Sequence, residues 1–433
     1  MWWPRYRGGP SPAPDPAVRV RIGTTGPDAH AAEALLRARG AGIVDDPDAP
    51  VDMLVVDEWT AETAPHVIAA RTAGAAVSVL AELILADAPR PLVGVTGTAG
   101  KTSTCRALEA ILRACARPVA ISTTARSANA WPDHSLADQL GAGVPHGCVV
   151  IAELTSTHLC HMTHVHPDVA VVTTIRPDHL ELHGGYRAYV AAKRRLVAEL
   201  TDADAVVLPT DDPTTIDALG AVNGRRWGFG DAPTDLGAFA VPGGVLLRGP
   251  DADGEAPTDL EGPPLRALLA AAAAALALGL TTEEVAGAVE HAPTVAHRQA
   301  QRPGPRGITI VDDSMAATPL KTRAAVERFS GPGLVVVLGG DDALGGEPVH
   351  SGAEEQAALR EALAMVREGA ASVVAFGPVR DRIASHIAVD ASCTAIDEAL
   401  ALAMASCPDG GTVVVSPMFP LTPAERERAA TFA

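Results

Sequence analysis

Lysine is rare in this chain, and each lysine stands near residues that could take part in catalysis. Lys101, Lys193 and Lys321 are the only lysines among 34 basic residues. Arginine serves wherever a positive charge is enough, so a retained lysine points to chemistry that needs a primary amine. Lys101 belongs to a glycine-rich loop, Lys193 follows the segment 178–184, and Lys321 follows the segment 312–314. A compositional bias with three random survivors is the alternative interpretation.

The segment 97–102 reads Gly-Thr-Ala-Gly-Lys-Thr and predicts a phosphate-binding loop between a strand over 92–96 and a helix. Glycines let the backbone N–H groups surround a phosphate, and the helix dipole favours the anion. Lys101 can bind the β- and γ-phosphates, and the Thr102 hydroxyl can ligate Mg²⁺. Val95 replaces a glycine of the general pattern, but the shorter Gly-Thr-x-Gly-Lys-Thr form matches. An ordinary glycine turn is the alternative.

Glu153 directly follows a buried strand expected over 149–152. A carboxylate at the C-terminal end of a parallel strand lies at the edge where α/β proteins bind ligands. Because Mg²⁺ prefers oxygen ligands, Glu153 can hold this ion. Taken alone, a glutamate at such a position would more often be a surface residue.

The composition narrows the class of partner. The net charge of −18 argues against nucleic acid and against an anionic membrane surface, which both attract basic proteins. The six cysteines are scattered, so neither a zinc site nor a disulfide framework follows from them, and we expect a cytoplasmic protein. The start of the chain lacks the apolar run of a signal peptide. The apolar run 268–280 is too short to cross a bilayer and predicts a buried helix.

The alternation of strands and helices predicts an α/β fold with parallel sheets. We expect a flexible tail over 1–17 and three domains: an N-terminal Rossmann-like domain over 18–90, a central P-loop ATPase-like domain over 91–293 and a C-terminal Rossmann-like domain over 294–433. The region 228–262 predicts a small antiparallel elaboration. The expected strands are 18–26, 51–56, 92–96, 149–152, 169–172, 308–311, 334–338, 372–376 and 412–415, and the expected helices include 29–39 and 101–114.

Several strings of residues occur in a familiar order. Asp178-His179-Leu180-Glu181-Leu182-His183-Gly184 is followed by Tyr186 and by Ala192-Lys193, and the C-terminal third holds Ala296-His297-Arg298, Val311-Asp312-Asp313-Ser314, Leu338-Gly339-Gly340-Asp341 and Val415-Ser416-Pro417. Together with the phosphate loop, these strings resemble the Mur ligases, ATP-dependent enzymes that build the peptide stem of bacterial peptidoglycan. Their spacing is most similar to the branch that joins muramoyl-alanine to glutamate. The resemblance runs from about residue 18 to the end.

The resemblance implies roles for the matching residues. ATP would be bound by Gly97, Thr98, Gly100, Lys101, Thr102 and Ser103, with Arg298 and Asp313 gripping the nucleotide when the domains close. Two Mg²⁺ ions would be held by Thr102, Glu153, His179 and Lys193, with His179 as the ligand of the second ion. The catalytic residues would be Lys101, Glu153, His179 and Lys193. Lys193 resembles a lysine that the family carbamylates with CO₂. Carbamylation turns a cation into an anionic oxygen ligand, which suits Mg²⁺ and is not open to arginine.

The implied reaction joins a small-molecule carboxylate to an amine. The carboxylate attacks the γ-phosphate of ATP to give an acyl phosphate and ADP, and the amine then displaces phosphate. Domain closure would exclude water that wastes the acyl phosphate. The N-terminal domain would bind the acyl substrate and the C-terminal domain the amine. The sequence leaves a monomer and a homodimer both open.

The chain departs from the family where the acceptor amine is bound. The family lysine that follows Asp-Ser is Met315, and Asp341-Asp342-Ala343 lacks the lysine expected after Gly-Gly-Asp. Lys321, about two helical turns after Met315, is the candidate to replace the lost charge. Two lost basic residues fit poorly with a dicarboxylic amino acid as the acceptor.

Other departures lie at the nucleotide and acyl ends. Leu265 and Leu268 stand where the family has an asparagine pair, Thr174 stands where it has a further asparagine, and 45–47 replaces its uridine-recognising segment. We therefore predict a divergent ligase of specialised metabolism.

Alternative functions remain open at this stage. A housekeeping ligase that adds glutamate to UDP-N-acetylmuramoyl-L-alanine is the alternative within the same class. A non-catalytic nucleotide-binding relative and a generic P-loop ATPase coupled to motion are the other hypotheses. Thr123, Thr124, Arg126 and Arg176 are expected to line a pocket for an anionic acyl substrate, unless they are solvated surface residues.

Overall fold

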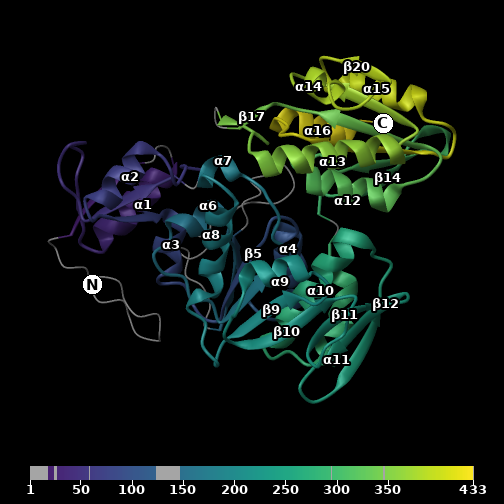
Figure 1. Cartoon of the computed structure of the whole chain (residues 1–433). Helices are drawn as coiled ribbons and strands as arrows, with labels where there is room; N and C mark the ends of the chain where they lie inside the picture. Colours follow the sequence, from purple (N-terminus) through teal and green to yellow (C-terminus); the bar gives the residue numbers. More distant parts are fainter. Residues whose placement is uncertain are drawn as a thin grey trace.

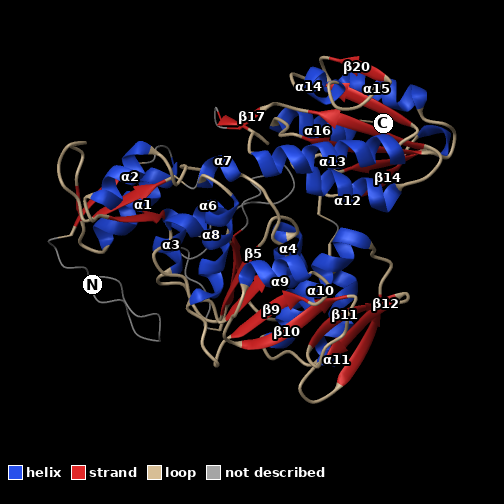
Figure 2. Ribbon diagram, in the orientation of Figure 1, coloured by secondary structure: helices blue, strands red, loops and turns tan. Residues whose placement is uncertain are grey.

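The computed structural model describes residues 18–23, 27–57, 59–122, 147–293, 295–344 and 347–432. Its strands form three main sheets, each built from one continuous stretch of the chain (Figures 1 and 2). The predicted α/β class with three units is confirmed. None of the described helices has the length and apolar character needed to span a bilayer. The domain limits 18–90, 91–293 and 294–433 remain a proposal.

The N-terminal unit is a four-stranded parallel sheet in the order β2-β1-β3-β4. Parallel pairing follows from the alternation of strands and helices along the chain. The segment 18–26 is predicted as a strand that enters a glycine-containing turn; the strand occurs as β1, and residues 24–26 lie outside the described part. The elements are β1 (Arg19–Ile22), α1 (Pro27–Ala38), β2 (Gly42–Ile43), β3 (Met53–Val56), α2 (Pro65–Thr72), β4 (Ala76–Val79) and α3 (Leu80–Leu85).

The central unit holds a nine-stranded sheet in the order β13-β12-β11-β10-β9-β8-β5-β7-β6. The strands from β6 to β11 pair in parallel, whereas β11-β12-β13 is antiparallel and confirms the predicted elaboration. The first elements are β5 (Leu92–Thr96), α4 (Lys101–Ala114), β6 (Val119–Ser122), β7 (Val149–Glu153), α6 (Ser156–His161), β8 (Val169–Val172), α7 (Leu180–His183) and α8 (Tyr186–Ala198). They are followed by β9 (Ala205–Pro209), α9 (Pro213–Leu219), β10 (Arg225–Gly230), β11 (Gly237–Val241), β12 (Gly244–Arg248), β13 (Asp253–Pro257), α10 (Gly262–Ala277), α11 (Thr282–Ala288) and a 3-10 turn over Val289–His291.

Alternate residues of the central strands enter two different hydrophobic cores, because side chains point to opposite faces of a sheet. Val93 and Val95 of β5 pack in the core that contains α4 and α10. Leu92 packs in the opposite core, which continues into the N-terminal unit. The predicted buried helix is α10, whose residues 267–276 are all buried, although it ends at Ala277 rather than at residue 280. The run of alanines lets α10 approach α4 closely.

The C-terminal unit is a six-stranded sheet in the order β14-β15-β21-β16-β19-β20, parallel except for the edge strand β14. In Figure 1 its helices α12 and α13 lie on the side that faces the central unit. The elements are β14 (Ala300–Pro303), a 3-10 turn over Pro305–Gly307, β15 (Thr309–Asp312), α12 (Pro319–Phe329), β16 (Leu334–Gly339), β17 (Ala343–Leu344), β18 (Glu347–Pro348), α13 (Ala353–Gly369), β19 (Ser372–Phe376), α14 (Arg380–Ala384), β20 (Ala391–Cys393), α15 (Ile396–Ser406), β21 (Thr412–Met418) and α16 (Pro423–Thr431).

Candidate active site

The phosphate-binding loop joins β5 to α4, as the sequence predicts. Gly97 has a φ of 151° and Gly100 a φ of 86°, a backbone region that favours glycine. A Cβ atom at Gly97 would lie 1.9 Å from Oγ1 of Thr173, so no larger residue fits there. The backbone N–H of Thr98 donates to the carbonyl of Thr174 at 2.7 Å, which fixes the loop against the end of β8.

Two lysine amines meet inside this loop. Nζ of Lys101 and Nζ of Lys193 each donate to the carbonyl oxygen of Gly97 at 2.8 Å. Burial lowers the pKa of both amines, and for Lys193 the charge of Lys101 lowers it further, to well below its ordinary value. The side chain of Lys193 also lies over the ring of Tyr189, 4.8 Å from its centroid. Lys193 therefore gives up its proton more readily than an exposed lysine, and the neutral amine is the form that reacts with CO₂.

Thr102 and Glu153 form the oxygen side of the site. Oγ1 of Thr102 donates to Oε2 of Glu153 at 2.8 Å, since parallel pairing of β5 and β7 places the end of β7 beside the loop. Arg298 of the C-terminal unit donates to Oγ1 of Thr102 at 3.0 Å. A hydroxyl and a buried carboxylate are donors that Mg²⁺ prefers, so this pair fits the predicted ion.

His179 lies at the start of α7 in a left-handed conformation, with a φ of 52°. Its Nε2 is 3.8 Å from Oδ1 of Asp178, and its Nδ1 is 3.5 Å from Oε1 of Glu181. Burial opposes protonation, but the two carboxylates outweigh it and raise the pKa of His179. Its ring packs edge-on against Trp59 of the N-terminal unit, with centroids 6.1 Å apart. His179 must lose a proton before it can ligate a metal.

Asp313 follows β15 and is buried against the neighbouring strand β21. Ser416 donates to its Oδ2 at 2.8 Å, and burial raises the pKa of Asp313 to about 7. The adjacent Asp312 instead contacts Nδ1 of His297 at 2.9 Å. Three of the C-terminal strings thus meet at one edge of their sheet, and Arg298 of the first string reaches the phosphate loop.

A cavity of about 560 Å³ opens between the loop and the C-terminal unit. Its lining includes Gly100, Ser103, Arg298 and Asp313 among the predicted nucleotide-binding residues. Its volume suits a nucleotide. Leu265 lines it as well, whereas Leu268 is buried in the core.

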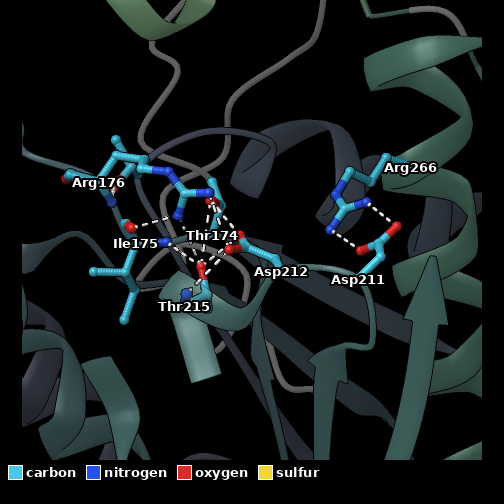
Figure 3. Close-up of polar contacts among 8 residues, drawn as sticks. Thr174, Ile175, Arg176, Asp211, Asp212, Thr215 and Arg266 are labelled. Carbon is cyan, nitrogen blue, oxygen red and sulfur yellow. Dashed lines mark hydrogen bonds and ion pairs between the residues drawn. The ribbon is translucent and has the colours of Figure 1, made fainter. Parts of the chain in front are cut away.

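Two arginine–aspartate pairs, which Figure 3 shows, belong to the lining of this nucleotide cavity. Arg266 forms a two-pronged contact with Asp211, at 2.9 and 2.7 Å, and Arg176 contacts Asp212 at 2.9 Å. Thr174 donates to the same Asp212 carboxylate at 3.1 Å. Thr174 and Leu265, two positions where the resemblance implies asparagines, line the same cavity.

A second cavity, of about 240 Å³, adjoins the first and will be called the acceptor cavity, after the role that is proposed for it below. Met315 and Lys321 line both cavities, so they stand between the two. Burial, with the charges of Lys101 and Arg298 nearby, lowers the pKa of Lys321 to about 8. The other residues of the lining include Trp59, Asp178, His179, Glu181, Ser314, His350, Glu355 and Arg426.

The structure thus brings most of the predicted residues together, in two neighbouring groups. Lys101, Thr102, Glu153 and Lys193 surround the phosphate loop, and His179 lies in the acceptor cavity. Thr98 has a supporting role, because its hydroxyl contacts Tyr189 at 2.7 Å and the backbone of residue 176. Arg176 lines the nucleotide cavity, while its predicted companions Thr123, Thr124 and Arg126 lie outside the described residues.

Some residues of the site had no role in the sequence interpretation. Asp178 begins one of the quoted strings and Tyr189 lies between Tyr186 and Lys193, but the burial of neither could be predicted from the sequence. Trp59, His350 and Arg426 come from three distant segments. No spacing in the sequence connects these three with the acceptor cavity.

Comparison with known proteins agrees with the geometry. Residues 95–238 match the profile of the Mur ligase middle domain. A UDP-N-acetylmuramoylalanine–D-glutamate ligase of Frankia casuarinae is 32% identical over 428 residues, which cover 92% of this chain and 84% of that protein. The chain belongs to the Mur ligase family. A UDP-N-acetylmuramoyl-L-alanine–L-glutamate ligase of Micromonospora sp. is 30% identical over 68% of this chain and 63% of its own length.

Solved structures agree on the fold. The MurF ligase of Thermotoga maritima in complex with ADP has a TM-score of 0.61 at 18% identity, and the alignment covers 96% of this chain and 94% of that one. Mur ligases are ATP-dependent, ADP-forming enzymes that make amide bonds. The predicted class, an ATP-dependent acid–amino-acid ligase that acts on small molecules, is confirmed at the level of this family.

Proposed function

We propose that this chain activates a carboxylic acid as an acyl phosphate and transfers it to an amino acid, in specialised metabolism. The observation that supports this most strongly is the meeting of Lys101 and Lys193 at the carbonyl of Gly97, beside the Thr102–Glu153 pair. Two amines and a carboxylate around a phosphate loop suit phosphoryl transfer to a carboxylate and exceed what nucleotide binding alone requires.

In the proposed site, Lys101 binds the β- and γ-phosphates of ATP, and Arg298 orients them from the C-terminal unit. Thr102, Glu153, carbamylated Lys193 and neutral His179 would hold Mg²⁺, which supplies charge neutralisation at the phosphates when bound. Lys193 gains its carbamate when the neutral amine attacks CO₂ and releases one proton. The carbamate then presents an anion to Lys101 in place of an amine, so the two side chains attract each other.

The proposed reaction passes through an acyl phosphate, which the neighbouring residues must protect from water. An oxygen of the acid attacks the γ-phosphorus, ADP leaves, and the amine of the acceptor then attacks the acyl carbon and expels phosphate. The N-terminal unit closes the acceptor cavity with Trp59, and Arg298 joins the C-terminal unit to the loop. Both contacts exclude water, which would otherwise hydrolyse the acyl phosphate.

Lys321 is the proposed anchor for the carboxylate of the acceptor amino acid. It lines the acceptor cavity and the nucleotide cavity at once, and within the described part of the chain its amine has no hydrogen-bond partner. Met315 leaves the cavity without the charge that the family has there. The charge is thus moved from the loop that precedes α12 to the first turn of that helix, which changes the shape of acceptor that can be bound.

The housekeeping reaction is a second candidate, because relatives of this chain are named as ligases of D- or L-glutamate. Release of phosphate from ATP separates the two. The assay supplies UDP-N-acetylmuramoyl-L-alanine with D-glutamate, L-glutamate and the other common amino acids, and then replaces the UDP-sugar by other carboxylic acids. Turnover with the UDP-sugar and glutamate assigns the housekeeping function. No turnover with any acid, although ATP binds, would contradict both candidates.

A further inference from the structure

A second cluster of reactive side chains lies where the N-terminal unit meets the central unit, and the proposed reaction does not use it. Glu62 precedes α2, Cys160 lies in α6 and His183 ends α7. One ligand atom of each lies within 4.8 Å of those of the other two. Among the described residues, this is the one such group of three or more potential metal ligands.

His183 is the residue that most needs a partner. Its side chain is fully buried, and neither Nδ1 nor Nε2 has a hydrogen-bond partner. Buried polar atoms in native structures nearly always have one. Nδ1 of the nearby His161 is also buried without a partner, while its Nε2 contacts the carbonyl of Thr60 at 2.8 Å. Two imidazoles with unpaired nitrogens thus border the same small region.

The contacts of Glu62 leave one carboxylate oxygen for this region. Oε1 lies 3.4 Å from Nη1 of Arg71, whereas Oε2 lies 3.5 Å from Nδ1 of His183. The geometry of the second contact is not that of a hydrogen bond. An ion about 2.0–2.2 Å from an oxygen and a nitrogen would bridge such a gap. Sγ of Cys160, now 3.2 Å from the carbonyl of Thr157, is the third donor.

We propose that Glu62, Cys160 and His183 bind a zinc-class divalent cation that joins the N-terminal unit to α6 and α7. Sulfur, imidazole nitrogen and carboxylate oxygen together suit Zn²⁺, whereas Mg²⁺ and Ca²⁺ take oxygen ligands. The fourth position falls to water. Binding breaks the S–H bond of Cys160, forms a metal–sulfur bond and releases one proton to solvent.

The position of the ion gives it a structural role. The N–H of Glu62 donates to the carbonyl of Leu182 at 2.8 Å, and Arg71 donates to the carbonyl of Cys160 at 2.9 Å. The cation would strengthen this existing contact between the N-terminal unit and helices α6 and α7. Because α7 also carries His179, the ion fixes the helix that presents His179 to the acceptor cavity.

Cobalt binding tests the proposal on the full chain. Protein freed of metal by a chelator and returned to excess Mg²⁺ is titrated with Co²⁺ and then with Zn²⁺. We expect one equivalent of Co²⁺ with a thiolate-to-cobalt charge-transfer band in the near ultraviolet, which Zn²⁺ abolishes. Cys160→Ala removes the band and weakens binding at least about 100-fold, whereas Cys148→Ala, at another buried thiol, keeps both. We expect Zn²⁺ to raise the Tm of the wild type and of Cys148→Ala, but not the Tm of Cys160→Ala.

A second measurement needs no variant, in case Cys160→Ala fails to fold. Zn K-edge absorption of the loaded wild type should show one sulfur at about 2.3 Å and nitrogen or oxygen at about 2.0–2.2 Å. Oxygen and nitrogen scatterers without sulfur overturn the proposal, as does Co²⁺ binding that is equally tight in Cys160→Ala. Absence of Co²⁺ and Zn²⁺ binding also overturns it.

Discussion

The amines of Lys101 and Lys193, both within 2.8 Å of one carbonyl oxygen, explain why a chain of arginines keeps these lysines. Lys101 must be a compact cation that fits inside the loop, and Lys193 must be able to lose its proton and react. An arginine can do neither, because its guanidinium is broad and remains charged. Two of the three lysines thus have physical reasons to be retained.

Lys193→Ala removes the proposed carbamate. We expect kcat to fall by on the order of 10²–10³-fold, as for the loss of one preorganised charge-stabilising group, while the Kd for ATP stays within a few-fold of wild type. A short carboxylic acid such as formate should restore part of the activity, because it can occupy the place of the carbamate. Steady-state phosphate release and nucleotide binding measure both. Unchanged kcat in Lys193→Ala would remove the lysine from the mechanism.

Lys321 should titrate within reach of an ordinary assay, since its pKa is lowered to about 8. Below that pH it is a cation that binds the acceptor carboxylate; above it the charge is lost, so kcat/KM for the acceptor should fall. Lys321→Arg keeps its charge above pH 8. The kcat/KM of Lys321→Arg for the acceptor, divided by that of the wild type, should therefore rise with pH. Deprotonation of the acceptor amine affects both enzymes alike and cancels in that ratio.

Lys321→Met should raise the KM for the acceptor about 10- to 100-fold, the range for a charge-assisted hydrogen bond, with the KM for ATP little changed. Equal losses for ATP and acceptor would mean that Lys321 serves the nucleotide instead.

At the scale of elements, the turn between β5 and α4 depends on one glycine. Gly97→Ala would place a Cβ atom 1.9 Å from Oγ1 of Thr173, with Thr173 held by the carbonyl of Ala99 at 2.5 Å. We expect loss of ATP binding, seen by calorimetry, with the fold retained in circular dichroism. Gly287→Ala is the matched control, because a Cβ at that position in α11 meets nothing within 4 Å. Normal ATP affinity in Gly97→Ala would contradict the packing described here.

Glu82 of α3 makes the interface between the N-terminal and central units sensitive to pH. Burial raises its pKa to about 7, although Ser78 and the N–H groups of Thr163 and His164 donate to it. The folded state therefore keeps a proton that the unfolded state releases near pH 4.5. Glu82 thus lowers the free energy of unfolding of the protein as pH rises from about 4.5 to 7.

Glu82→Gln removes that loss. The variant should be more stable than wild type above about pH 7, by up to about 3 kcal/mol, and equal to it near pH 4.5. Thermal unfolding at both pH values checks this. A Tm difference that does not change with pH would show that Glu82 is not the titrating group.

At the scale of the whole molecule, the sequence predicts the units and the phosphate site well, because both are local. The strand over 92–96 and the helix over 101–114 occur at the predicted residues, since apolar runs and a glycine turn define them. The contacts between the units could not be predicted from the sequence. Trp59 reaches His179, Arg298 reaches Thr102, and Glu62 meets Cys160 and His183 only through tertiary packing. Scattered cysteines gave no hint of that last cluster.

The most direct test of the account is the fate of oxygen from the acid substrate. Once the phosphate-release assay has identified an acid and an amine, the acid is supplied with ¹⁸O in its carboxylate, and the released phosphate is analysed by mass spectrometry. The account predicts one ¹⁸O atom in each phosphate and one amide formed per ATP, because the attacking carboxylate oxygen leaves with the phosphoryl group. Phosphate without ¹⁸O, or ATP hydrolysis that does not depend on the acid, would contradict the acyl-phosphate mechanism.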